Sequence, residues 1–158
     1  MTDFTVKDAL SRAVEAALGS TCLKSRRGVV VFSRVHGVLS SGHNGPPPPF
    51  VCDGSEQCRA ACGKISVHAE MRAILALDSH ARKAHAKTGC LEMLHVKIDE
   101  GGRAVPSGPP SCWQCSRHVL ETGISRVWLL DEDGLVPYVA VDFHRLTLRH
   151  HGLPEVAR

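Results

Sequence analysis

Helical and strand-like patterns alternate along this chain, and that alternation limits the folds it can adopt more than any other feature. Apolar residues recur at helical spacing over 5–18, and three further segments are predicted to be helical: 67–77, 112–121 and 142–151. Four short runs are typical of strands: 28–32, 38–41, 91–98 and 127–130. Strands alternating with helices predict a layered α/β domain. The first two strands are close enough to form an antiparallel hairpin, so the sheet is expected to be mixed.

The 158 residues are expected to form one domain, because no internal repeat and no linker divides residues 1–158. Four consecutive prolines within 42–54 exclude a helix or a central strand, and this segment is predicted to be a rigid, exposed loop. Residues 99–110, rich in glycine and proline, form a second predicted loop. The strand over 91–98 is expected to be buried mainly on one face, because its apolar residues alternate with more polar ones.

Composition excludes several functional classes. The 19 Lys and Arg against 16 Asp and Glu give a net charge of +3, which argues against non-specific binding to duplex nucleic acid. Aromatic residues make up 4% of the chain, which argues against a surface on which the bases of single-stranded nucleic acid stack. The first ten residues hold no apolar stretch of a signal peptide, and no segment is apolar enough to span a membrane. A cytoplasmic protein is therefore expected, whose seven cysteines serve as metal ligands, catalytic groups or core residues.

Two short motifs carry the chemistry. His68 and Glu70 are two residues apart, and Cys112 and Cys115 form a Cys-x-x-Cys at the start of a predicted helix. A helix N-terminus favours thiolates, the form of cysteine that binds metal. One histidine and two cysteines leave the fourth position of a zinc ion open, as in catalytic zinc sites. Glu70 would stand beside that position and transfer the proton of a water molecule.

Other interpretations of these motifs remain open. A Cys-x-x-Cys alone is also found in structural zinc sites and in redox pairs. The alternative from a different class is a non-catalytic zinc module that binds a nucleotide or a partner. Glu70 distinguishes them, because a structural module has no use for a carboxylate beside an open metal position.

The two motifs together resemble those of the zinc-dependent cytidine and deoxycytidylate (dCMP) deaminases. The resemblance extends upstream, over roughly 5–130, and includes Ser20-Thr21-Cys22-Leu23-Lys24 and Gly42-His43-Asn44-Gly45-Pro46. It implies a three-layer α-β-α fold with a five-stranded mixed sheet. The implied activity is hydrolytic deamination of a cytosine nucleotide such as dCMP to the uracil form, and the implied assembly is a homo-oligomer.

The resemblance also implies site residues. Glu70 would be catalytic, and the catalytic zinc would be held by His68, Cys112 and Cys115. Some dCMP deaminases carry a second, structural zinc, and its ligands here would be Cys22, Cys52, Cys58 and Cys62, stabilising an insert at about 43–66. Four residues would contact the substrate: Asn44, Ala69, Ser111 and Trp113. Trp113 packing against the sheet and Asn44-Gly45 forming an ordinary turn are the alternatives.

Three positions depart from the family pattern. Ser111 separates Pro110 from Cys112, Arg72 stands where the family tends to have asparagine, and His43 takes the place of a tyrosine. These changes concern the pocket and not the metal ligands. They leave open another substrate, which could be a free base, a nucleoside, a modified cytosine or single-stranded nucleic acid.

Overall fold

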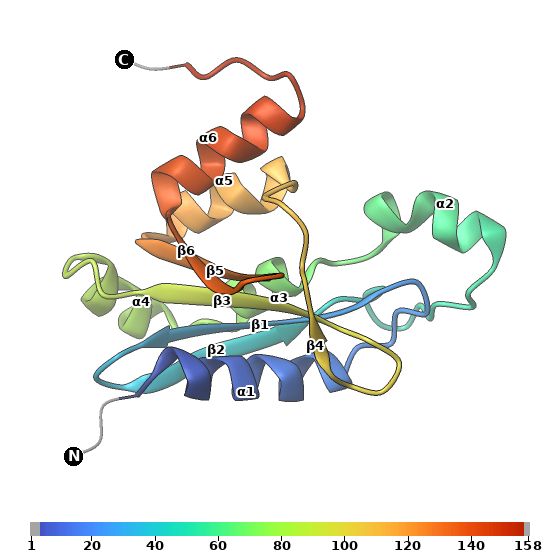
Figure 1. Ribbon diagram of the computed structural model, residues 1–158, viewed down its shortest axis with the longest axis horizontal. Helices are drawn as coiled ribbons and strands as arrows, with labels where there is room; N and C mark the ends of the chain where they lie inside the picture. Colours follow the sequence, from blue (N-terminus) through green and yellow to red (C-terminus); the bar gives the residue numbers. More distant parts are fainter. Residues whose placement is uncertain (1–3, 157–158) are drawn as a thin grey trace.

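The computed structural model describes residues 4–156, so the ends of the predicted 1–158 domain, 1–3 and 157–158, lie outside the described residues. The centre is one mixed sheet with the strand order β2-β1-β3-β5-β6 (Figure 1). Among the described strands, only β3 and β5 pair in parallel, and a sixth, two-residue strand, β4, pairs with β3 beside this path. The strands are β1 (Arg26–Ser33), β2 (Gly37–His43), β3 (Glu92–Ile98), β4 (Ala104–Val105), β5 (Arg126–Asp131) and β6 (Gly134–Val139).

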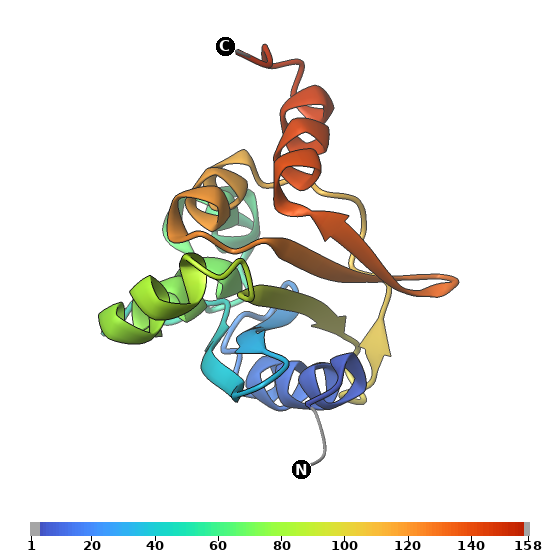
Figure 2. The ribbon, with the colours of Figure 1, turned by 90° about the vertical axis from the view of Figure 1, so that its left-hand side faces the viewer.

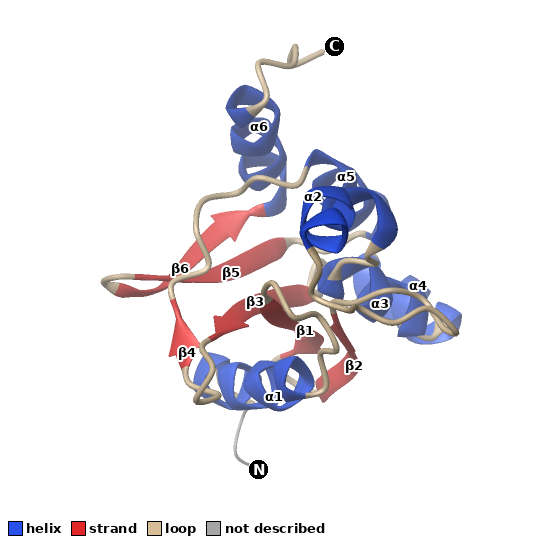
Figure 3. Ribbon diagram, turned by 90° about the vertical axis from the view of Figure 1, so that its right-hand side faces the viewer, coloured by secondary structure: helices blue, strands red, loops and turns tan. Residues whose placement is uncertain are grey.

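Helices cover both faces of this sheet, which makes three layers (Figures 2 and 3). The helices are α1 (Val6–Leu18), α2 (Glu56–Ile65), α3 (Ala69–Ala76), α4 (Ser79–Ala86), α5 (Trp113–Thr122) and α6 (Ala140–His150). On one face α1 packs against Val30, Phe32 and Leu94, and on the other α3, α5 and α6 pack against Val29, Val31 and Met93. The predicted three-layer fold with a mixed sheet is thereby confirmed.

Two glycines bring helices close to the sheet. A Cβ atom at Gly28 would lie 2.1 Å from the Ala13 carbonyl oxygen of α1, and one at Gly42 would lie 2.5 Å from the Ala69 carbonyl oxygen of α3. Both distances are well below van der Waals contact, so only glycine allows these approaches. Gly42 therefore sets the position of α3, the helix that follows His68 and carries Glu70.

The prediction of one-sided burial for the 91–98 strand was wrong. All residues of β3 are buried except the partly buried Lys97. The physical reason is the position of β3 between β1 and β5, under helices on both faces, which the spacing of its residues alone does not reveal. His95 is consequently a buried residue, 5% exposed.

Four elements were not predicted from the sequence: α2, α4, β6 and the two-residue β4, which lies within the predicted loop of 99–110. Neither α2 nor α4 contains a buried residue, so neither shows the apolar periodicity by which a helix is recognised. Local caps begin them instead, with Ser55 accepting from the Cys58 N–H and Asp78 accepting from the His80 N–H. Among the described residues, no helix combines the length and apolar character needed to cross a membrane.

Candidate active site

His68, Cys112 and Cys115 come together where two helices begin on the same face of the sheet. His68 is the N-cap residue of α3, Cys112 is the N-cap residue of α5, and Cys115 lies in the first turn of α5. His68 Nδ1 lies 3.2 Å from Cys112 Sγ and 3.3 Å from Cys115 Sγ. Within residues 4–156, this is the only group of three or more His, Cys, Asp or Glu side chains whose ligand atoms all lie within 4.8 Å of one another.

This donor set fits a zinc ion. One imidazole nitrogen and two sulfurs supply three tetrahedral positions, which is the number that catalytic zinc sites use. Cys112 has the thiolate character that metal binding requires. Hydrogen bonds, the strongest from Cys115 and a weaker one from His68, lower its pKa to about 5. The chain therefore brings together, before any metal binds, three side chains that could hold a metal ion, and they are the three expected from the sequence.

Glu70 lies in the first turn of α3, two residues beyond His68, and is partly buried. Burial favours the neutral acid, but the nearby His95 and the backbone N–H of Glu70 favour the carboxylate more strongly, so the pKa of Glu70 lies below its usual value. A carboxylate held ionised beside a metal-ligand group is suited to accept a proton.

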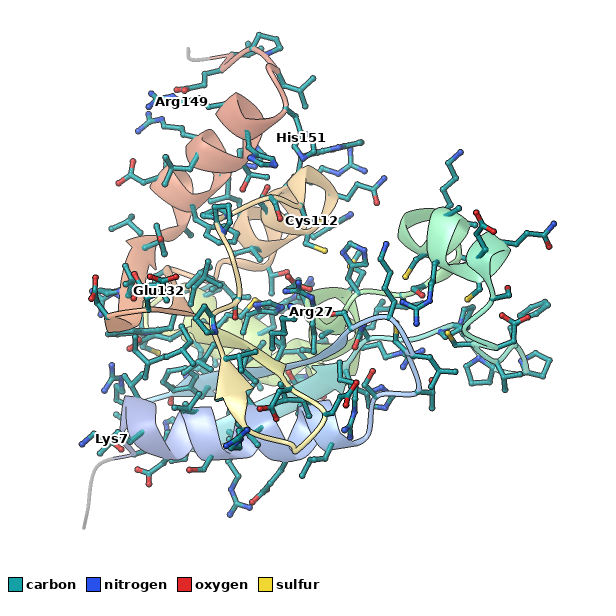
Figure 4. All side chains as sticks on the ribbon, turned by 45° about the vertical axis from the view of Figure 1, so that its right-hand side comes forward. Lys7, Arg27, Cys112, Glu132, Arg149 and His151 are labelled. Atoms are coloured by element: carbon teal, nitrogen blue, oxygen red, sulfur yellow. The ribbon has the colours of Figure 1, made fainter. Side chains whose placement is uncertain are left out.

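These four residues line one cavity of about 300 Å³. Its floor is formed by β1 and β3, and its walls by the starts of α3 and α5 and by the loop 107–111. Figure 4 labels Arg27, on β1, and Cys112, at the start of α5. The cavity is large enough for a small ligand. Its other charged or imidazole-bearing lining residues are Lys24, Arg27 and His95.

Three of the four predicted substrate residues, Asn44, Ala69 and Ser111, line this cavity. The Asn44 side chain also organises the wall: Oδ1 accepts from Ser20 Oγ at 2.7 Å and from the Arg27 N–H at 2.8 Å, and Nδ2 donates to the Ser25 carbonyl at 2.7 Å. Asn44 thus ties β2 to the segment that leads into β1. The alternative of an ordinary turn residue does not account for these bonds.

Trp113 does not line the cavity. It lines a separate groove between α5, α6 and the segment after α6, with the Arg117 guanidinium 5.0 Å from its ring centre. The reason is helical geometry. Residues three apart, such as Cys112 and Cys115, lie on the same face of a helix, whereas adjacent residues do not. With Cys112 and Cys115 directed at His68, Trp113 is directed away from it.

Arg72 and His43, which depart from the family pattern as Ser111 does, contact each other. Arg72, on α3, donates to the carbonyl oxygens of His43, Gly45 and Pro46 at 3.2, 3.1 and 2.8 Å, and lies 3.1 Å from His43 Nδ1. Arg72 is therefore occupied with the start of the proline loop and is not among the residues that line the cavity.

The four cysteines proposed for a second metal are only partly assembled. Cys52 Sγ and Cys58 Sγ lie 3.4 Å apart, whereas Cys62 Sγ lies 3.6 Å from Ser66 Oγ. Cys22 is buried, and Cys22 and Cys62 both line the cavity. The four do not form a group of mutually close ligands in the described part of the chain, so the second zinc remains a prediction.

Two cavity residues were not singled out by the sequence analysis. Arg27 lies next to Arg26, and nothing in their spacing distinguishes one from the other, while His95 belongs to the strand that was expected to be buried mainly on one face. Their shared signal is register: Arg27 pairs with Lys97 and Val29 pairs with His95, so both side chains belong to the face on which α3 packs.

Solved structures share this architecture, although no protein-family model and no curated protein matches the chain. A cytidine deaminase from Burkholderia pseudomallei is similar with a TM-score of 0.57 and 15% identity, over 89% of this chain and 96% of that chain. The chain has a cytidine deaminase-like fold. A dCMP deaminase from the cyanophage S-TIM5, in complex with dCMP and dUMP, is similar with a TM-score of 0.55 and 19% identity, over 89% of this chain and 90% of that chain.

Proposed function

We propose that this chain is a zinc-dependent deaminase of the cytidine and dCMP deaminase family that acts on a cytosine nucleotide such as dCMP. The reaction adds water at C4 of the base, and it yields the uracil form and ammonia. The observation that carries this proposal is the position of Glu70 in the same cavity as the ligand group of His68, Cys112 and Cys115. The deaminase fold of the chain supports it.

Glu70 carries the proton transfers in this proposal. A zinc ion held by the three ligands would lower the pKa of a bound water toward about 7. The Glu70 carboxylate, ionised at neutral pH, takes one proton from the water and delivers it to N3 of the base. It then passes the second proton to the exocyclic nitrogen, which leaves as ammonia. Water, base and products balance without any further reactant.

The walls of the cavity would orient the base. Ala69 and Ser111 line it next to Glu70 and Cys112, and the loop that contains Ser111 would lie beside the leaving amine. The Asn44 amide uses one N–H on the Ser25 carbonyl, so its second N–H is the group proposed to reach the nucleoside. Because three bonds fix this amide, it would meet the substrate with little loss of conformational freedom.

Two further parts of the proposal rest on the resemblance of the sequence. The first is a structural zinc held by Cys22, Cys52, Cys58 and Cys62. The second is a homo-oligomer, which sedimentation of the purified protein would test. A monomer at micromolar concentration would contradict the second part and leave the chemistry untouched.

Ammonia release from a panel of amines tests the activity. The panel holds dCMP, CMP, dCTP, cytidine, deoxycytidine, cytosine, 5-methyl-dCMP, guanine, adenosine and a cytosine-containing DNA oligonucleotide, with the Glu70→Gln protein measured beside it. We expect the unchanged protein to turn over dCMP and its close analogues, and the Glu70→Gln protein to turn over none of the panel. Turnover confined to other members of the panel would show that the substrate is not dCMP. No turnover of any member would favour the non-catalytic zinc module.

A further inference from the structure

The cavity floor contains polar groups that the proposed deamination does not use. Arg27 extends from β1, His95 from β3, and Ser25 from the segment before β1, and all three line the cavity. Arg27 is only partly exposed, and within residues 4–156 no carboxylate lies within 4.0 Å of its guanidinium nitrogens. Glu70 shares the cavity but forms no ion pair with Arg27, so the guanidinium keeps hydrogen-bond donors available to a ligand.

Arg27 is held in place through one of its nitrogens. Nη1 donates to the Ser107 carbonyl at 3.2 Å and lies 3.5 Å from His95 Nε2. Arginine only donates, so Nε2 of His95 is the acceptor and its proton resides on Nδ1. The deep burial of His95 lowers its pKa to about 4, which keeps the imidazole neutral and able to accept from the guanidinium. The donors on Nε and Nη2 of Arg27 have no hydrogen-bond partner among the described residues.

A second, independent observation points to a ligand at this floor. Among the described residues, two buried side-chain polar atoms lack a hydrogen-bond partner, Ser25 Oγ and His95 Nδ1. Both belong to residues that line this cavity. Unpaired buried polar atoms are few in folded proteins and can mark a place where a water molecule or an ion is bound, so two of them in residues that line one cavity point to a polar occupant there.

We propose that Arg27, positioned by His95 and flanked by Ser25, is the specificity-determining residue of this cavity and binds an electron-rich oxygen of the substrate. Arginine suits this role because its planar guanidinium presents two parallel donors to one oxygen or to a pair of oxygens. The oxygen belongs either to the carbonyl of the base or to a phosphate of the nucleotide. This inference rests on the proposed function and names the group by which the substrate is selected.

Binding measurements on matched variants test the proposal. The probes are dCMP, deoxycytidine and inorganic phosphate, measured by calorimetry on zinc-loaded protein in which Glu70→Gln prevents turnover of the probes. Arg27→Met keeps the aliphatic stem and removes the donors, and Arg27→Lys keeps the charge. The control is Arg26→Met, because Arg26 precedes Arg27 on the same strand and directs Nη2 to the Leu18 carbonyl on the α1 side of the sheet. Thermal unfolding of each variant verifies that it is folded.

We expect Arg27→Met to weaken dCMP binding by about ten- to hundredfold, as the loss of a charge-assisted hydrogen bond does, with Arg27→Lys between and Arg26→Met unchanged. Equal weakening for dCMP and deoxycytidine identifies the carbonyl of the base as the oxygen. Weakening confined to dCMP and inorganic phosphate identifies the phosphate. If the protein with Arg27 intact binds none of the probes, or Arg27→Met binds dCMP as tightly as Arg26→Met does, the proposal is overturned.

His95 is a positioning residue and has its own readout. His95→Phe should raise KM for the same substrate that Arg27→Met affects, with kcat changed less, and the two substitutions should not be additive because they act through one guanidinium. His95→Gln, which retains an acceptor, should recover part of the loss. Additive effects of His95→Phe and Arg27→Met would contradict this role. Turnover that persists while the binding result fails would overturn this inference and leave the deaminase proposal standing.

Discussion

Two groups of cysteines in this chain have contrasting structural support. Cys112 and Cys115 open α5, which packs through the buried Val119, and their partner His68 opens α3, which lies against β1 and β2. The insert of 43–66, by contrast, contains α2, which buries no residue and stands apart from the sheet (Figure 1). The first group is assembled by the folding of the core. In the second, Cys52 and Cys58 lie close together but the four sulfurs do not form one group, so a metal would have to complete the assembly.

The largest loss of activity is expected at Glu70, which lies beside the group formed by His68, Cys112 and Cys115. Glu70→Gln keeps the size of the side chain and removes its ability to carry a proton, so ammonia release should fall by about 10²- to 10⁴-fold. Zinc content and thermal stability should stay near those of the unchanged protein, because Glu70 is not one of the three ligands. Activity that survives this substitution would remove Glu70 from the mechanism.

The next prediction separates the two cysteine groups. Metal analysis should give two zinc ions per chain, and Cys112→Ser and Cys58→Ser should each lose one. Only Cys58→Ser should open residues 43–66 to limited proteolysis, because only there would a metal take the place of a core. Cys112→Ser should lose the activity and keep the protease-resistant insert. One zinc in the unchanged protein, with an unaltered cleavage pattern for Cys58→Ser, would refute the second metal.

A third prediction concerns the sheet floor beneath the assembled group. The pKa of His95 is lowered from 6.5 to about 4 by burial, so the unfolded chain binds its proton at a higher pH than the folded chain does. The stability of the folded protein should therefore fall as the pH drops from 6.5 toward 4, by about 3 kcal/mol from this residue alone.

Urea unfolding of the unchanged protein and of His95→Leu, from pH 7 to pH 4, isolates this contribution. The metal ligands titrate in both proteins, so the difference between their free energies of unfolding reports His95. We expect the unchanged protein to lose more stability on acidification than the variant. Parallel pH profiles would show that His95 is not buried as a neutral imidazole.

The smallest effect is expected for Trp113. It lies between the two cysteine ligands in sequence but lines a different groove, so Trp113→Phe should change kcat/KM by less than about twofold. Steady-state kinetics on the best substrate of the panel measure this. A tenfold or larger loss of kcat/KM would return Trp113 to the substrate site.

The features that the sequence predicted are those expressed in local patterns. Helical periodicity with buried alanines gave α1, and the motif spacing placed His68 and the two cysteines at the starts of helices. The strand β6 escaped prediction because Pro137 interrupts its pattern, which is tolerated since β6 is an edge strand. The polar cavity floor escaped because it depends on the order of strands in the sheet, and strand order is a property of the whole fold.

The contacts of Arg72 have a consequence for how such a protein diversifies. One guanidinium on the helix that carries Glu70 binds the backbone carbonyls of His43, Gly45 and Pro46 at the entrance to the proline loop. Because these bonds go to the backbone, they place few demands on the side chains of the loop itself. Residues 47–51, none of which lines the cavity, can therefore change in sequence while the anchor and the reacting groups keep their places.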